Sequence, residues 1–271
     1  MLFCVAEQTP GATFNPPTQY STEENLASRQ RLWSTSRRVP EFDLFTWVLD
    51  LGGIASGSTQ STLDVGCGNG AYERALATRG HRGPRVALDL SAGMLPLVSD
   101  AAVVLADAQK LLFCSAWFDL VLAPHMLYHV PDVESAAKEI RRVLRPTGLF
   151  IAVTNSVSNP QELRALVEAA VGSDWKMLRP ADERFSMENG AQLLSSAFES
   201  VVRVDCPSTQ LVVTDVYALA QYVASVADHY ESQVEVPWST VTSRVYELAN
   251  EAMASDGELR LRTGAGAFVC R

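Results

Sequence analysis

An apolar segment that runs directly into three closely spaced glycines constrains the fold of this 271-residue chain more than any other feature. Residues 63–70 read LDVGCGNG, and a helical pattern begins at Ala71. Gly66, Gly68 and Gly70 allow the backbone to turn sharply and approach a ligand closely, while the N-terminus of the following helix offers unpaired N–H groups. The segment therefore predicts a strand, a tight turn and a helix, with a small polar ligand bound at the turn.

Short apolar segments alternate with helical ones from residue 61 to 154, which is typical of a parallel, doubly wound sheet. A helix over 133–144 is expected, with Asp132 as its N-cap and Pro146 beyond its end. The last residues, GELRLRTGAGAFVCR, have the pattern of a strand pair. The predicted fold class is α/β, a doubly wound and mostly parallel sheet with an antiparallel C-terminal strand pair.

Two helical additions to this sheet are expected. Residues 1–58 would form an N-terminal arm and a helical cap, and residues 59–271 would form the core. A helical insertion at about 214–257 would lie between the last two strands as a lid. Because no internal repeat and no Ser/Gly linker separates these parts, the sequence predicts a single domain overall.

Charge and composition exclude several classes of partner. The formal net charge is -9 and there is no long Lys/Arg run, which argues against nucleic acid or an anionic membrane surface. No apolar stretch approaches the roughly 18 residues that span a bilayer, and no signal-peptide pattern opens the chain, so a cytoplasmic location is expected. The five cysteines never form a CxxC pair, so they indicate neither a zinc site nor a disulfide framework.

The glycine turn alone does not identify its ligand. Gly66, Gly68 and Ala71 also satisfy the GxGxxG/A pattern of dinucleotide-binding folds. Asp89 ends the next expected strand, 23 residues after Gly66 (89 − 66), where a carboxylate can accept both ribose hydroxyls of either cofactor. An NAD(P)-dependent oxidoreductase is therefore a real alternative on these residues.

Further along, the chain resembles the class I S-adenosylmethionine-dependent methyltransferases. The motifs that carry the resemblance occur in the family's order and read LDVGCGNG, ALDLSAGML, LADAQKL, FDLVLAPHMLYHVPD and VLRPTGLFIAVT. In a dinucleotide enzyme, Asp107 and the segment HMLYHVPD would have no assigned role, so the methyltransferase is favoured. A protein that binds S-adenosylmethionine without consuming it is a third alternative. The resemblance is strongest to small-molecule methyltransferases of actinobacterial biosynthetic pathways, with S-adenosylhomocysteine as product.

The resemblance implies roles around the methionine and ribose of the cofactor. Asp64 and Gly66 would position the methionine amino end, and Gly68 and Gly70 would shape the loop. Asp89 would hold the ribose hydroxyls. Two of these roles have structural alternatives, because Asp89 could merely cap the next helix and Asp64 could merely brace the loop.

Four more residues are implied on the adenine side. Leu90 and Met94 would pack on the ring, and Asp107 with the backbone of Ala108 would read its amino edge. Asp107 could instead cap the segment that follows it. All of these positions lie at strand ends or in loops at one edge of the predicted sheet.

The reacting centre is expected at PHMLYHVPD, residues 124–132, which leaves the fourth strand where the sulfonium should point. His125 follows that strand directly and is the candidate base, since imidazole titrates near neutrality. His129 occupies the family's HxPD pattern, for which a structural role is the alternative. Tyr20 resembles an N-terminal tyrosine that closes over the cofactor in several small-molecule methyltransferases.

The acceptor is expected to be a small molecule with an oxygen or nitrogen nucleophile, held by the cap and the 214–257 insertion. His229, Tyr230 and Trp238 in that insertion could line its pocket, although core packing explains the aromatic residues equally well. Methyl transfer needs the nucleophile roughly in line with the methyl–sulfur bond, so positioning supplies much of the rate enhancement.

Overall fold

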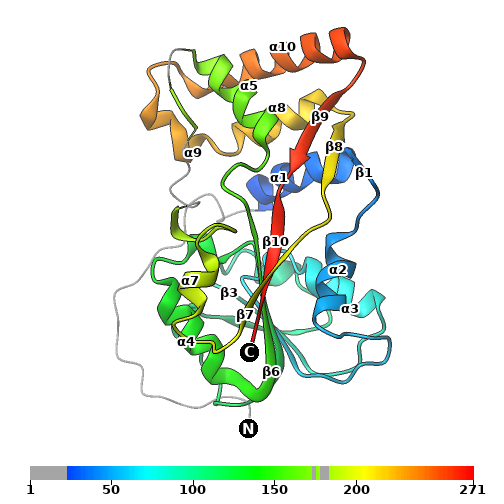
Figure 1. Cartoon of the computed structure of the whole chain (residues 1–271), viewed down its shortest axis with the longest axis vertical. Coiled ribbons are helices and arrows are strands. Elements are labelled where there is room, and N and C mark those ends of the chain that lie inside the picture. The colour runs from blue at the N-terminus through cyan, green and yellow to red at the C-terminus, as the bar shows by residue number, and fades with distance from the viewer. Residues whose placement is uncertain (1–22, 173–174, 178–182) are drawn as a thin grey trace.

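Two sheets organise the chain in a computed structural model that describes residues 23–172, 175–177 and 183–271. A large sheet with helices on both faces forms the lower part of the molecule in Figure 1, and a smaller sheet with long helices lies above it. Tyr20 lies outside the described residues, so its predicted role stays a prediction. Among the described residues, no helix has the length and apolar character needed to cross a membrane.

The large sheet confirms the predicted fold class. In spatial order the strands are β4 (Ala102–Leu105), β3 (Arg85–Asp89), β2 (Thr62–Val65), β5 (Phe118–Pro124), β6 (Leu144–Asn155), β10 (Ala265–Cys270) and β7 (Val201–Asp205). The first five of these strands run parallel to one another, and the inserted β10 runs antiparallel to both of its neighbours.

Helices cover both faces of this sheet because its central strands are apolar on both sides. On β5, Val121 packs beneath the helices on one face, while Leu120 and Leu122 pack beneath those on the other. One face carries α2 (Leu44–Leu51) and α3 (Ala71–Thr78), and the other carries α4 (Val133–Val143) and α7 (Gly190–Leu194). Helix α4 has the predicted bounds to within one residue, and Asp132 is its N-cap, accepting from the backbone N of Ser135 at 3.0 Å.

The upper layer, here called the lid layer, combines segments from three parts of the chain. Its antiparallel sheet has the order β1-β8-β9. Its elements are α1 (Glu23–Thr35), β1 (Arg37–Val39), α5 (Gln161–Val171), β8 (Thr209–Val213), α8 (Val216–Ala224), α9 (Ala227–Tyr230), the short 3₁₀ helix η4 (Glu231–Gln233), α10 (Trp238–Asp256) and β9 (Leu259–Thr263). Leu32 of α1, Leu163 of α5 and Val241 of α10 belong to one buried hydrophobic cluster. The division into residues 1–58 and 59–271 stays a prediction.

The carboxyl ends of the parallel strands face the lid layer. Strand β6 leads upward into α5, and β9 of the lid layer leads down into β10 (Figure 1). A direct contact joins the two layers at the glycine turn, where the Asn69 side chain donates a hydrogen bond to Gln30 Oε1 at 2.9 Å. Helix α1 therefore covers the carboxyl ends of the strands, where the ligand site is predicted.

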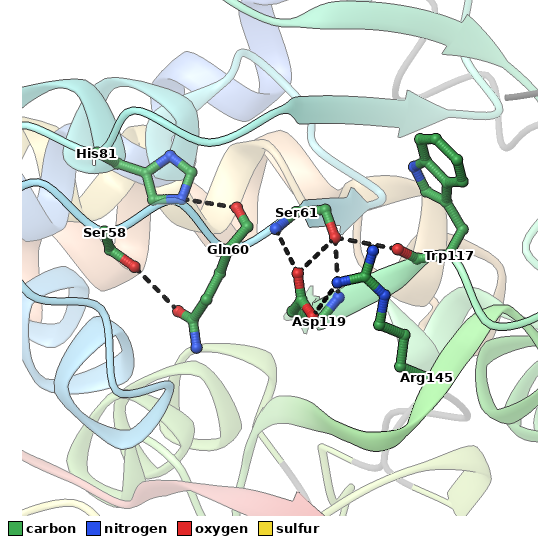
Figure 2. Close-up of polar contacts among 7 residues, drawn as sticks. All are labelled: Ser58, Gln60, Ser61, His81, Trp117, Asp119 and Arg145. Atoms are coloured by element: carbon green, nitrogen blue, oxygen red, sulfur yellow. Dashed lines mark hydrogen bonds and ion pairs between the residues drawn. The ribbon is translucent and has the colours of Figure 1, made fainter. Parts of the chain in front are cut away.

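At the opposite side, where the parallel strands begin, a polar network joins β2 and β5, as Figure 2 shows. Asp119 Oδ2 accepts from the backbone N and the hydroxyl of Ser61, both at 2.8 Å, and Arg145 pairs with its other oxygen. Burial alone would raise the pKa of Asp119, but these hydrogen bonds and the guanidinium lower it. This carboxylate is fully partnered inside the protein, and it braces the start of β2 against β5.

Candidate active site

The glycine turn has the backbone geometry that its sequence predicts. Gly66, Gly68 and Gly70 have φ angles of 70°, 52° and 74°, in the left-handed region that favours glycine. A side chain at position 66 would also collide with Met126, because a Cβ there would lie 2.6 Å from the Met126 Cβ. The turn therefore requires glycine both for its conformation and for the close approach of the segment after β5.

Asp89 holds this turn from the end of β3. Its Oδ2 accepts from the backbone N of Gly68 and its Oδ1 from the backbone N of Ser91, both at 2.8 Å. Each carboxylate oxygen has a second lone pair that a ligand hydroxyl can use. The bracing role and the ribose-binding role are therefore compatible, and the second stays a prediction.

Asp64 is the most unusual group at the site. It is 1% exposed, and neither carboxylate oxygen has a hydrogen-bond partner among the described residues. Burial raises its pKa well above the ordinary value, and the nearby carboxylates of Glu73 and Asp89 add to the rise. A buried carboxylate without donors is costly, so this position calls for a partner that the described chain does not supply.

Glu73, in the first turn of α3, is a site residue that the sequence reasoning missed. It is 1% exposed, and neither of its oxygens has a hydrogen bond among the described residues, although Arg85 Nε lies 3.9 Å from Oε2. Burial raises the pKa of Glu73 to about 7, against the opposing effect of Arg85. A signal was available, because Glu73 lies three residues before the buried Leu76 and so occupies the apolar face of its helix.

The adenine-side residues lie along the same edge. Asp107 Oδ1 accepts from the backbone N of Gln109 at 2.8 Å, which is the capping contact foreseen as its alternative role. Met94 is 1% exposed and Ala108 5% exposed, so both are packed into the protein, whereas Leu90 is half-buried. Their contacts with an adenine ring stay predictions.

The segment after β5 places His125 in a strained conformation beside the glycine turn. Its φ is 55°, in the left-handed region that non-glycine residues rarely adopt, and its backbone N donates to Val153 O at 2.8 Å. Burial lowers the pKa of His125 to about 4, so the imidazole is neutral at neutral pH and can accept a proton. Its neighbour Met126 is the residue that contacts Gly66.

His129 ends the short 3₁₀ helix η3 (Leu127–His129). Its ring lies edge-on to the ring of Tyr128 with 4.5 Å between centroids, and its backbone N donates to Met126 O at 2.9 Å. These contacts fix the position of His129 in the segment. Whether it also acts on the acceptor stays a prediction.

The aromatic residues of the insertion take the alternative role foreseen for them. The rings of Tyr230 and Trp238 stack with 5.4 Å between centroids, and the two residues are 0% and 2% exposed. Both belong to the hydrophobic cluster of the lid layer. Their stacking packs α9 against α10, and His229 beside them is half-buried.

Together, the strand order with an inserted antiparallel strand and the glycine turn after the first parallel strand define the Rossmann-like methyltransferase fold. Comparison with known proteins agrees, since residues 63–152 match the family model described as a methyltransferase domain. Residues 63–152 of the chain are therefore similar to the methyltransferase-domain family.

Individual relatives match parts of the chain. A malonyl-[acyl-carrier protein] O-methyltransferase of Methylovorus sp. is 33% identical over 119 residues, covering 39% of this chain and 40% of that protein. The human mitochondrial protein named arginine-hydroxylase NDUFAF5 is 25% identical over 226 residues, covering 79% of this chain and 65% of that protein. The chain thus spans less than two thirds of the length of either relative.

A solved structure confirms the fold over more of the chain. It is a protein of Anabaena variabilis provisionally named a methyltransferase from an antibiotic biosynthesis pathway. The TM-score is 0.62 at 15% sequence identity, and the match covers 86% of this chain and 98% of that chain. At this identity the likeness shows the fold alone.

Proposed function

We propose that the protein transfers a methyl group from S-adenosylmethionine to an oxygen or nitrogen nucleophile of a small-molecule acceptor. The observation that carries the proposal is the buried Asp64 carboxylate beside the glycine turn, whose two oxygens have no hydrogen-bond partner among the described residues. The ammonium group of the cofactor's methionine end offers both the N–H donors and the positive charge that this position needs.

The remaining cofactor contacts follow from the same edge. Asp89, held by Gly68 and Ser91, would present its free lone pairs to the ribose hydroxyls. Leu90 and Met94 would bound the adenine, and Asp107 with the backbone of Ala108 would read its amino group. When bound, S-adenosylmethionine supplies an electrophilic methyl group, and the work of the chain is to hold this group in line with the acceptor.

On the acceptor side, His125 is the proposed hydrogen-bond acceptor for the nucleophile. Its pKa of about 4 keeps it neutral, so it can take a proton at neutral pH, but it also makes the imidazole a weak base. Orientation of the acceptor hydroxyl or amine is therefore its main contribution. His129 and Tyr20 are the further candidates for contact with the acceptor.

The lid layer is proposed to hold the acceptor and exclude water. Helix α1 already contacts the glycine turn through Gln30 and Asn69. The relative from Methylovorus sp., named an O-methyltransferase, supports an oxygen nucleophile. The negative net charge supports a small molecule over nucleic acid as acceptor. A cytoplasmic location is part of the same proposal.

A second candidate function is S-adenosylmethionine binding without methyl transfer. The observation that favours it is that a relative aligned over 79% of this chain is named for arginine hydroxylation. The two candidates share the cofactor site and differ in whether S-adenosylmethionine is converted to S-adenosylhomocysteine in the presence of an acceptor.

Calorimetric titration with S-adenosylhomocysteine tests the shared part. The wild type is expected to bind, and Asp64→Asn is expected to bind more weakly by about 1.5–3 kcal/mol, the range for a hydrogen bond to a charged group. Glu139→Gln is the matched control, because the Glu139 carboxylate lies on α4 and already accepts from Leu111 N and Arg142. An Asp64 variant with wild-type affinity would contradict the proposed contact.

A turnover assay separates the two candidates. The protein is incubated with S-adenosylmethionine and a fractionated small-molecule extract, and the S-adenosylhomocysteine formed is measured by mass spectrometry. Methyl transfer predicts that particular fractions stimulate product formation. Tight cofactor binding with no product in any fraction would favour the second candidate.

A further inference from the structure

We propose that Glu73 is a positioning residue that keeps a proton on the buried Asp64–Glu73 pair, so that the cofactor's ammonium group binds at Asp64 by displacing that proton. The inference rests on the proposed function, since it takes the ligand of Asp64 to be the methionine end of the cofactor. What it adds is a role for Glu73 and a proton that leaves when the ligand arrives.

The geometry places the pair in a polar layer between α3 and the sheet. Thr62 and Asp64 are two residues apart on β2, so they share one face of the sheet. Arg85 pairs with Thr62 in the strand register, and Ala87 pairs with Asp64. Glu73 of α3 lies beside Arg85, whose Nε is 3.9 Å from its Oε2.

The contacts within the layer leave both acids short of donors. Arg85 Nη1 donates to the backbone O of Glu73 at 3.2 Å, and Arg85 Nε approaches its carboxylate only to 3.9 Å. No hydrogen bond to either carboxyl group exists among the described residues. By contrast, Asp89 receives two backbone N–H bonds.

The charges around Asp64 and Glu73 are unbalanced. Besides the two acids, four titratable groups interact with one or both of them: Cys67 of the glycine turn, Tyr72 of α3, and Asp89 and Arg85 of β3. Burial raises the pKa values of Cys67 and Tyr72, so both are neutral. Arg85 is the single cation among these groups, and it cannot compensate both Asp64 and Glu73 if both are ionised.

One proton therefore stays on the Asp64–Glu73 pair in the ligand-free protein at neutral pH. An unpaired buried carboxylate costs more than a neutral carboxylic acid, and the two groups titrate as a coupled unit. The pKa of Glu73 at about 7 and the raised pKa of Asp64 agree with this assignment.

Binding of an ammonium group at Asp64 replaces the charge of that proton. The Asp64 carboxylate then pairs with the ligand, Glu73 pairs with Arg85, and one proton passes to solvent. By linkage, the affinity for a ligand that carries an ammonium group should rise by up to tenfold per pH unit below about pH 7 and level off above it. The limit at high pH is set by the ligand, because its amino group no longer carries a positive charge once it loses its own proton.

Calorimetry with S-adenosylhomocysteine at pH 6, in buffers that differ in ionisation enthalpy, counts the released protons. We expect close to one proton for the wild type and fewer for Glu73→Gln, because the variant removes a carboxylate that raises the pKa of Asp64. Glu139→Gln, whose carboxyl group is hydrogen-bonded elsewhere in the core, should keep the wild-type count.

The outcomes are distinguishable. Tight binding to the wild type with no proton release at pH 6, or an unchanged count in Glu73→Gln, would overturn the role of Glu73 and leave the proposed function intact. No binding to the wild type at any pH would overturn the proposed function as well. If Glu73→Gln does not fold, the proton count of the wild type between pH 5.5 and 8 decides: a count near one at pH 6 that falls above about pH 7 supports the proposal, and a count of zero throughout overturns it.

Discussion

Replacing Glu73 by glutamine is expected to change how the stability of the ligand-free protein depends on pH. In the folded protein the pKa of Glu73 is about 7, against an ordinary value of 4.5. Between these values the native state binds more protons at this residue than the unfolded state does. The contribution of Glu73 to the free energy of unfolding therefore falls as pH rises through this window.

The size of the effect follows from the two pKa values. A rise from 4.5 to about 7 is worth about 3 kcal/mol at 1.36 kcal/mol per pH unit, and Glu73 is only 1% exposed, so solvent screening discounts it little. The contribution is complete below pH 4.5 and lost above pH 7. Glutamine does not titrate, so the advantage of Glu73→Gln over the wild type should grow by up to about 3 kcal/mol between pH 5 and pH 8.

Urea unfolding at pH 5, 6, 7 and 8 measures this difference. Glu139→Gln serves as the control, because hydrogen bonds from Arg142 and Leu111 overcome the effect of burial and lower the pKa of Glu139. Its contribution is constant above pH 5, so that variant should differ from the wild type by a constant amount. Parallel pH profiles for the wild type and Glu73→Gln would refute the reasoning.

Three further predictions concern the site and the lid layer. Asp89→Ala should weaken S-adenosylhomocysteine binding by about 1.5–3 kcal/mol in calorimetry; an unchanged affinity would move the ribose contact elsewhere. His125→Ala should lower turnover by about 10²-fold with cofactor affinity kept, because the acceptor loses the hydrogen bond that orients it, and near-normal turnover would remove His125 from the mechanism. Replacing residues 214–257 with a short turn should abolish turnover, lower the melting temperature and leave S-adenosylhomocysteine affinity within a few fold. If that variant loses S-adenosylhomocysteine affinity together with turnover, the segment is a structural part of the core.

The parts of the fold that the sequence predicted well are those fixed by local signals. The glycine turn, the parallel strands around it and the ends of α4 depend on backbone conformation, apolar runs and caps, which neighbouring residues determine. The small β1-β8-β9 sheet was not predicted. A single strand within 199–213 was expected, but β7 and β8 pair with different sheets, and such pairing depends on residues far apart in the chain.

The same distinction applies to the candidate site. Asp64 and Asp89 stand at strand ends, where the motif alone places them. Glu73 was missed because its importance comes from its surroundings in the fold, namely the burial of its side chain and its distance to Arg85. Tyr230 and Trp238 could not be assigned from sequence, since an aromatic residue in a lid can face a ligand or a core with equal ease.

A crystal structure of the protein with S-adenosylhomocysteine tests the central claim most directly. The account predicts the ligand's ammonium group within hydrogen-bond distance of the Asp64 carboxylate and its ribose hydroxyls at Asp89, with the chain of the turn from Gly66 to Gly70 against the methionine end. Electron density for the ligand at another place, or an NAD(P) cofactor that occupies this edge while S-adenosylhomocysteine does not bind, would contradict it.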